Sequence, residues 1–295
     1  MSWQASAIRA AARFAVRPVL ARPQAPGAAR AQFARGARRL FRAPPYTLTL
    51  ADTLGGVPGQ WVSNRPRQRG VILYFHGGAY TMGSSATHAP MLAALARRSG
   101  LEAFLPDYRL APEHAFPAAF DDAVAVFDGL LARGHDPRTI ILGGDSAGGG
   151  LALALLSHLC RTDRRPAGLF AFSPWTDLTF SGASLVTNSA RDQVLPAHRL
   201  TEIRALILGG ARPADADDPR LSPLHASFPQ VPPVLLHAAE TEILRDDALR
   251  MRGRLPDAEI RIAGDLPHVW PILHNWLPEA RETLDQTTRF VLSCL

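Results

Sequence analysis

A serine held between glycines is the residue of this sequence best placed to do chemistry. Residues 144–148 read Gly-Asp-Ser-Ala-Gly, the pattern G-x-S-x-G, and lie between an apolar run at 139–142 and an apolar helical pattern at 151–159. In a strand–turn–helix of this kind the serine adopts strained backbone angles and its hydroxyl stands exposed. The helix N-terminus beneath it favours developing negative charge. The pattern therefore predicts Ser146 as a nucleophile that attacks a carbonyl carbon.

A second glycine-rich segment offers hydrogen-bond donors for the oxyanion that such an attack creates. Residues 76–80 read His-Gly-Gly-Ala-Tyr and directly follow an apolar run at 71–75. An oxyanion needs N–H donors about 3 Å away, and glycines let the backbone come that close. In sites of this type one donor comes from the residue after the serine, here Ala147, and others come from such a loop.

The base that deprotonates Ser146 is expected late in the chain, after the acid. His268 follows the last predicted strand at 259–262 and precedes a predicted helix at 271–293. The rival His274 falls inside that helix, where a packing or surface role is more typical. We therefore expect His268 to be the base.

The acid that orients the histidine is expected after the apolar run at 234–237. Asp246 and Asp247 open the next predicted helix, where capping and compensation of the helix dipole account for them. Glu240 and Glu242 lie in the loop before it. Of these two loop acids we favour Glu242.

An alternation of strand and helix patterns must position these residues. Nearly continuous apolar strands are typical of a sheet buried on both faces, and strand–helix alternation favours a mostly parallel sheet with helices on both sides. Strands are predicted at 46–50, 71–75, 101–105, 139–142, 168–172, 234–237 and 259–262. Helices are predicted at 88–99, 117–133, 146–161, 245–255 and 271–293.

One stretch interrupts the alternation. Between about 176 and 230 no clear strand is predicted, and the segment holds a helical pattern at 197–209 and an acidic Ala/Asp/Pro loop at 211–219. An insertion at this point would lie above one end of the sheet as a lid.

The positive charge of the chain is concentrated at its start. The net charge is +6, but residues 1–51 hold nine arginines and no acid, so the other 244 residues carry a net charge of −3. Arg9, Arg13 and Arg17 recur every four residues and form one stripe of an amphipathic helix. Residues 21–45, rich in Pro, Gly, Ala and Arg, predict a linker. We favour a helix that packs on the neighbouring domain over one that lies on a membrane surface or acts in targeting.

Composition excludes several other classes. The two cysteines predict no disulfide framework, and no Cys/His cluster has zinc spacing, so neither a metal nor a cofactor is expected. No run of 18 apolar residues predicts a membrane span, and Arg17 and Pro18 interrupt the only candidate secretory segment. We expect a cytoplasmic monomer or homodimer without a nucleic-acid partner.

Five motifs, in order, resemble those of the hormone-sensitive-lipase-like family of bacterial esterases within the α/β-hydrolases. The resemblance implies an α/β-hydrolase fold over 46–295, with a mostly parallel eight-stranded sheet flanked by helices. It also implies a helical cap formed by 1–45 and about 178–222. The motifs are HGGAY at 76–80, DYRLAPE at 107–113, GDSAG at 144–148, EILRDD at 242–247 and LPH at 266–268.

The resemblance also assigns site residues. It implies a catalytic triad of Ser146, Glu242 and His268. Gly77 would form the turn of an oxyanion hole whose donors are Gly78, Ala79 and Ala147. The family usually has a third glycine where Ala79 stands, and the added methyl group would narrow the acyl pocket.

These features predict a serine carboxylesterase that hydrolyses small-molecule esters with short to medium acyl chains. Tyr80, Trp175 and Leu206 are candidate walls of its pocket. The same site could serve a lactonase or an N-acyl (amide) hydrolase. A non-catalytic ligand-binding homologue is disfavoured because the serine, an acid and the histidine are all present.

Overall fold

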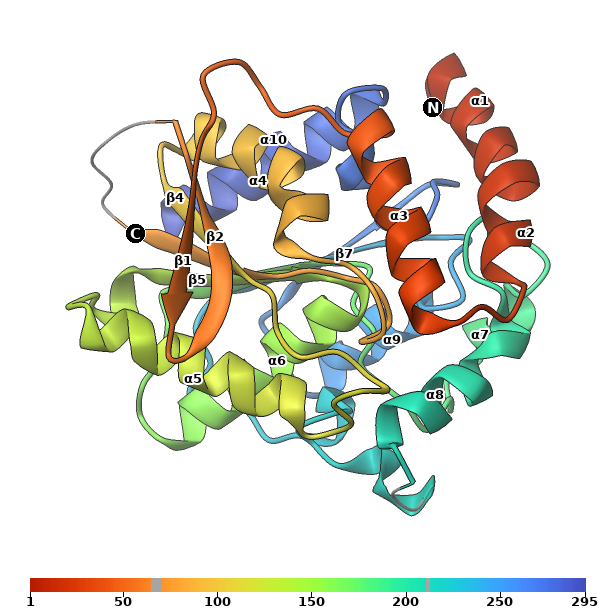
Figure 1. The fold of residues 1–295 in the computed structure, drawn as a ribbon. Coiled ribbons are helices and arrows are strands. Elements are labelled where there is room, and N and C mark those ends of the chain that lie inside the picture. Colours follow the sequence, from red (N-terminus) through yellow and green to blue (C-terminus); the bar gives the residue numbers. More distant parts are fainter. Residues whose placement is uncertain (65–69, 211–212) are drawn as a thin grey trace.

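The predicted strands form one sheet of eight strands in the computed structural model, which describes residues 1–64, 70–210 and 213–295. The strand order is β1-β2-β4-β3-β5-β6-β7-β8, with β1–β2 and β2–β4 antiparallel and the remaining pairs parallel. The expected α/β-hydrolase fold is confirmed (Figure 1). The strands are β1 (Leu48–Leu54), β2 (Val57–Ser63), β3 (Val71–Phe75), β4 (Glu102–Pro106), β5 (Ile140–Asp145), β6 (Gly168–Phe172), β7 (Val234–Ala239) and β8 (Glu259–Ala263).

Strand β2 is missing from the sequence prediction, for a physical reason. Pro58 and Gly59 suggest a loop, yet they lie in a hairpin closed by Gly55 and Gly56, both at positive φ. A side chain at Gly59 would lie within 2.5 Å of the Phe104 ring, so the glycine lets β2 approach its neighbour.

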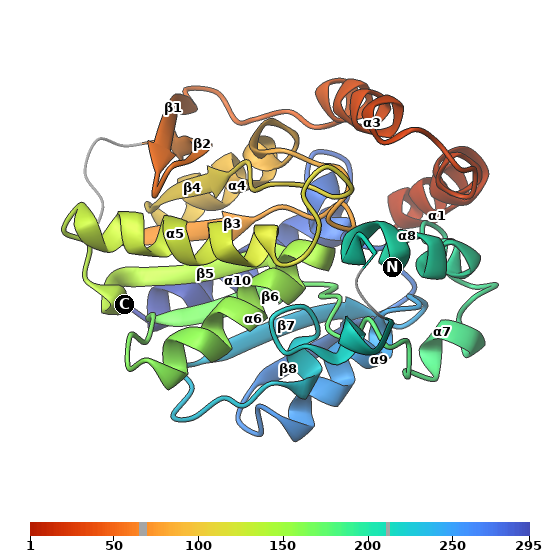
Figure 2. The ribbon, with the colours of Figure 1, turned by 60° about the horizontal axis from the view of Figure 1, so that its bottom comes forward.

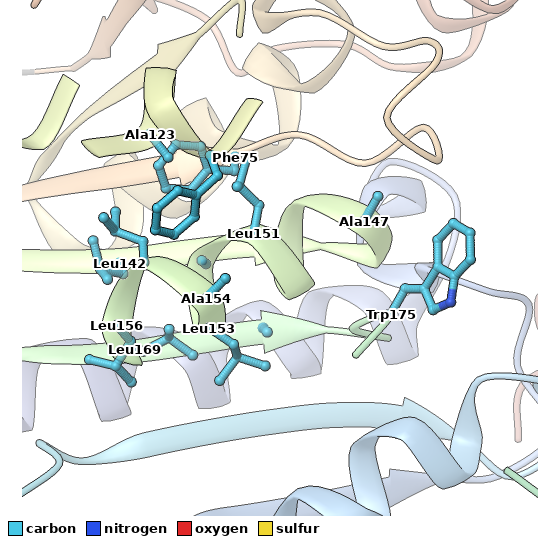
Figure 3. Packing of buried hydrophobic residues seen from close by; sticks show 14 of the residues in the cluster. Phe75, Ala123, Leu142, Ala147, Leu151, Leu153, Ala154, Leu156, Leu169 and Trp175 are labelled. Atoms are coloured by element: carbon cyan, nitrogen blue, oxygen red, sulfur yellow. The ribbon is translucent and has the colours of Figure 1, made fainter. Parts of the chain in front are cut away.

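Two layers of helices cover the sheet (Figure 2). Helices α5 (Ala118–Ala132) and α6 (Ser146–Arg161) pack on one face, and α4 (Ser85–Ser99) and α10 (Pro278–Ser293) on the other. Strand β3 shows why its sequence is continuously apolar. Its side chains alternate between the two cores, since Val71, Leu73 and Phe75 join one cluster and Ile72 and Tyr74 the other. Figure 3 shows part of the first cluster around α6.

The chain after β8 differs from its prediction. The single helix expected at 271–293 is a 3₁₀ turn at Trp270–Leu273 followed by α10, which begins at Pro278. Proline suits the first turn of a helix and not its interior, so the helix starts there. His274 consequently lies in the turn before α10, where it is buried.

The prediction of a linker over residues 21–45 is wrong in part. Residues 3–20 form a continuous helical segment composed of α1 (Trp3–Ala11), a π-helical turn (Ala12–Val16) and α2 (Arg17–Leu20). A further helix, α3 (Pro26–Leu40), occupies most of the supposed linker. Pro26 stands in its first turn, and its many Ala and Arg residues are strong helix formers that outweigh two glycines.

The segment between β6 and β7 is helical wherever it is regular. Within its described residues no strand occurs, and it contains α7 (Ser184–Thr187), α8 (Leu200–Leu208) and 3₁₀ turns at 197–199, 213–217 and 223–225. The first residues of the loop expected at 211–219 lie outside the described residues. Helices α7 and α8 lie on the same side of the molecule as α1–α3 in both views (Figures 1 and 2).

Hydrogen bonds join these two parts of the chain, which are remote in sequence. Arg13 and Arg17 donate to the carbonyl oxygens of Ala190 and Ser189, and Arg199 donates to those of Leu20 and Arg22. The arginines of the first helical segment therefore bind the segment between β6 and β7, although Arg13 itself is exposed. No helix of the described chain combines the length and apolar character needed to cross a membrane.

Candidate active site

Ser146 occupies a strained turn between β5 and α6. Its φ is +52°, a left-handed value that a residue other than glycine rarely adopts. Neighbouring glycines make the turn possible: a Cβ at Gly144 would lie 2.3 Å from the Gly148 oxygen, and one at Gly148 would lie 2.1 Å from the Phe75 oxygen. The sequence context thus produces the predicted turn.

The three residues expected to form a triad lie in one hydrogen-bonded chain. His268 Nε2 is 2.9 Å from Ser146 Oγ, and His268 Nδ1 is 2.8 Å from Glu242 Oε2. They come from three loops at the carboxyl ends of β5, β7 and β8. The spacing suits an imidazole that donates from Nδ1 to the carboxylate and accepts at Nε2 from the serine hydroxyl.

The Glu242 carboxylate is buried and fixed by two further donors. Its Oε1 accepts hydrogen bonds from Ser173 Oγ at 2.7 Å and from the Ala239 amide at 2.9 Å. Sequence reasoning missed Ser173. Its place directly after β6 was the available signal, because loops after parallel strands gather at this edge of the sheet.

The rival residues are engaged elsewhere. Asp246 accepts the Ser184 amide, and Asp247 accepts the amides of residues 176 and 177. Glu240 pairs with Arg245 at 2.8 Å and is about half exposed. Burial raises the pKa of Asp247 to about 7. These contacts hold the acid loop together and leave Glu242 as the carboxylate at the histidine.

The charges around His268 raise its pKa. Burial lowers the pKa of this imidazole, but the adjacent Glu242 carboxylate, assisted by Asp192 and Asp145, more than reverses the effect. The net result is a pKa above the ordinary value of 6.5. A raised pKa makes the histidine a stronger base toward the serine proton.

The loop at 77–79 is shaped by its contact with Asp145. The Gly77 amide donates to Asp145 Oδ1 at 3.0 Å, and a Cβ at Gly77 would lie only 2.1 Å from Asp145 Oδ2. Gly78 and Ala79 then take positive φ values of 124° and 53°. Across the described chain, no acceptor binds the amides of Gly78 and Ala79. The amide of Ala147, in the first turn of α6, has no acceptor within the helix.

Asp145 anchors this loop from beneath. Tyr74 donates to its Oδ1 at 2.8 Å, and His88 Nε2 lies 3.4 Å from the same oxygen. Burial raises the pKa of Asp145, but the electrostatic interaction with His88 and the hydrogen bonds outweigh burial and leave the pKa below its ordinary value. Neither Asp145 nor His88 was predicted as a supporting residue. His76 stacks on a tyrosine, and burial lowers its pKa to about 3.

The candidate wall residues have different surroundings. Tyr80 is buried and lines a small cavity of about 20 Å³ with Leu151 and Ile207. Trp175 is buried against Phe180, and its backbone amide donates to the backbone carbonyl oxygen of Ser146 at 2.9 Å. Leu206 is half-buried and does not line this cavity, whereas its neighbour Ile207 does.

Hydrogen bonds and an ion pair join the acid and histidine loops to the loop after α7 and to helix α1. Asn188 Nδ2 donates to the Glu242 carbonyl oxygen at 2.8 Å. Asp265, three residues before His268, accepts from Gln193 at 2.7 Å and pairs with Arg9 at 2.7 Å. In the described residues no group of three His, Cys, Asp or Glu side chains could hold a metal ion.

Comparison with known proteins places this geometry in a family. A family model described as alpha/beta hydrolase fold matches residues 72–270. An esterase of Acinetobacter venetianus is 34% identical over 261 residues, which cover 86% of this chain and 85% of that protein. An acetyl-hydrolase of Streptomyces hygroscopicus is 34% identical over 244 residues, 81% of each chain. The crystal structure of an esterase from the bacterial hormone-sensitive lipase family superposes with a TM-score of 0.92 at 35% identity, over 99% of this chain and 98% of that one.

Proposed function

The chain belongs to the alpha/beta hydrolase fold family, among the hormone-sensitive-lipase-like esterases, and from that premise we propose that it hydrolyses carboxylic esters through Ser146, His268 and Glu242. Its relatives establish an ester hydrolase, and the residues and the acyl preference are our proposal. The observation that carries it is the hydrogen-bonded chain from Ser146 through His268 to Glu242.

In the acylation half-reaction the Ser146 oxygen attacks the ester carbonyl while His268 Nε2 takes its proton. Glu242 holds Nδ1–H and stabilises the imidazolium that results. The amides of Gly78, Ala79 and Ala147 donate to the oxyanion. As the tetrahedral intermediate collapses, His268 returns the proton to the leaving alkoxide, and the alcohol departs.

In the deacylation half-reaction water replaces the alcohol. His268 removes a proton from the water as it attacks the acyl-serine, and the same oxyanion donors act again. Collapse returns the proton to Ser146 and releases the carboxylic acid. Every proton moves between substrate, water and these side chains, so the steps need no added group.

We further propose that acyl groups of short to medium length fit best. The Ala79 methyl group stands in the oxyanion loop, where the family usually has a glycine. The similarity to an acetyl-hydrolase supports the same range. Residues 1–45 and about 178–222 are proposed as the cap that closes over this site, since arginines 13, 17 and 199 bind one part to the other.

The test of this proposal measures hydrolysis of p-nitrophenyl esters, with acyl chains of C2 to C12, by the wild type and by the Ser146→Ala variant. We expect it to lose nearly all turnover and all labelling by a serine-directed phosphonate, while Ser293→Ala, which changes an exposed serine at the end of α10, retains both. Equal turnover by Ser146→Ala and wild type would refute it. A lactone and an acetamide measured alongside separate an esterase from a lactonase or an amide hydrolase.

A further inference from the structure

The helical segment 3–20 turns small apolar residues and arginines toward the protein. Ala5 and Ala12 are its buried residues. Here Arg9 and Arg17 reach toward the protein, where they bind Asp265 and the Ser189 oxygen. The opposite side of the helix is left facing solvent.

That opposite side is an uninterrupted apolar stripe. Its members are separated by four, three, four and four residues, the spacing that keeps side chains on one face of a helix. The two aromatic members are strongly exposed, Trp3 at 76% and Phe14 at 77%. This outer stripe consists of Trp3, Ala7, Ala10, Phe14 and Pro18, all of them exposed.

The stripe belongs to a wider apolar and basic surface. Two further large hydrophobic residues, Val16 and Leu40, are exposed on the same N-terminal helices. Helix α3, the neighbour of α1 in both views, exposes Arg35, Arg38 and Arg39 (Figures 1 and 2). No carboxylate of the described chain lies within ion-pair distance of these three, and residues 1–51 contain no acid.

We propose that the outer stripe and the α3 arginines bind the surface of an anionic phospholipid membrane. Tryptophan and phenylalanine partition into the interfacial zone of a bilayer, and arginines beside them are attracted to anionic headgroups. A second copy of this chain fits less well, because a two-fold contact would bring the same unpaired arginines of both copies together.

This docking does not depend on the chemistry proposed for Ser146, but it bears on the substrate. Arg9, on the inner side of the same helix, pairs with Asp265, which lies three residues before His268. A membrane on the outer side would therefore lie close to the histidine loop, and esters dissolved in it would be delivered near the site.

Sedimentation with vesicles tests the proposal on the full-length protein. The probes are vesicles of equal parts phosphatidylglycerol and phosphatidylcholine, and vesicles of phosphatidylcholine alone. The double variant Trp3→Ser/Phe14→Ser removes the stripe. The matched control is Leu48→Ser/Leu50→Ser, which removes two apolar side chains with exposures of 59% and 66% from the edge strand β1.

We expect the wild type and the control to bind the anionic vesicles, and the Trp3/Phe14 variant to bind at least tenfold more weakly. The triple change of Arg35, Arg38 and Arg39 to glutamine should weaken binding on the order of a hundredfold. Added salt should also weaken binding of the wild type, because it screens the attraction between the arginines and the anionic headgroups. Tryptophan emission should shift to the blue with vesicles in the wild type but not in Trp3→Phe. Binding is measured by sedimentation and does not depend on turnover, since residues 1–45 also belong to the proposed cap.

Three results would overturn the proposal. They are absence of binding to the anionic vesicles, binding that survives loss of Trp3 and Phe14, and a dimer in sedimentation velocity that these two changes dissociate. The last result would assign the surface to a second copy.

Discussion

Replacing Glu242 by glutamine tests the acid of the proposed triad. The change keeps the size of the side chain and removes its charge. It also turns one acceptor oxygen into an NH₂ donor, and the surroundings dictate where that donor must point. One oxygen of Glu242 faces the Ala239 amide and the Ser173 hydroxyl, and the other faces His268 Nδ1.

The Ala239 amide can only donate, so the amide oxygen of the glutamine must stay on that side. Its NH₂ group then faces His268 Nδ1 and makes this nitrogen an acceptor. The imidazole proton then moves to Nε2, and a protonated Nε2 cannot accept the proton of Ser146. In a serine protease, an acid-to-amide change at the corresponding place lowers kcat about ten-thousandfold, and we expect a loss of about a thousandfold to ten-thousandfold here.

Steady-state turnover of p-nitrophenyl butyrate is the assay, with near-ultraviolet circular dichroism as the control for folding. The fall should be in kcat with little change in KM, since Glu242 does not touch the substrate. Glu240→Gln serves as the matched control, because Glu240 is in the same loop and pairs with Arg245 instead. A Glu242→Gln variant within tenfold of wild type, or an equal loss in Glu240→Gln, would refute the reasoning.

Three further outcomes are expected. The log of kcat/KM should rise with pH as His268 loses its proton, because the neutral form of His268 is active. The Glu242 carboxylate raises the pKa of His268, so the midpoint of this rise should lie above pH 6.5, and a midpoint below 6.5 would contradict the reasoning. Gly77→Ala should lower kcat about a hundredfold or more, because its Cβ would collide with Asp145 and move the oxyanion donors, whereas a p-nitrophenyl acetate rate like wild type would show that the loop adapts. Asp247 holds a proton between pH 3.8 and about 7 that the unfolded chain releases, so stability to urea should fall as pH rises through that window, and Asp247→Asn should flatten the slope.

The sequence predicts the buried part of the fold well. Strands β3 and β6 begin and end where expected because continuous apolar runs have one good solution, a strand covered on both faces. The errors fall where local signals and tertiary contacts disagree. Pro58 and Gly59 suggest a loop but lie in β2, and two glycines mask the helix α3.

The site divides in the same way. Ser146 and His268 could be placed because their motifs carry their own local geometry. Ser173, Asp145 and Asp265 could not, because each acts through a contact with a residue far away in the chain. A serine after a strand or an aspartate in a loop has many ordinary roles, and only the folded arrangement shows which carboxylate or amide it meets.

The arginine stripe of the first helix illustrates the limit of periodicity most clearly. A recurrence every four residues predicts that Arg9, Arg13 and Arg17 share one side, but the usual rule would turn that side to water. The protein offers Asp265 and the carbonyl oxygens of Ser189 and Ala190 instead, and charge-assisted hydrogen bonds to them draw the stripe inward. Periodicity thus defines the faces of a helix, whereas the partners available in the folded chain decide where a charged face lies, here beside the buried Ala5 and Ala12. Here that choice brings the N-terminal helix to the loop of the proposed base and exposes an apolar stripe on its outside.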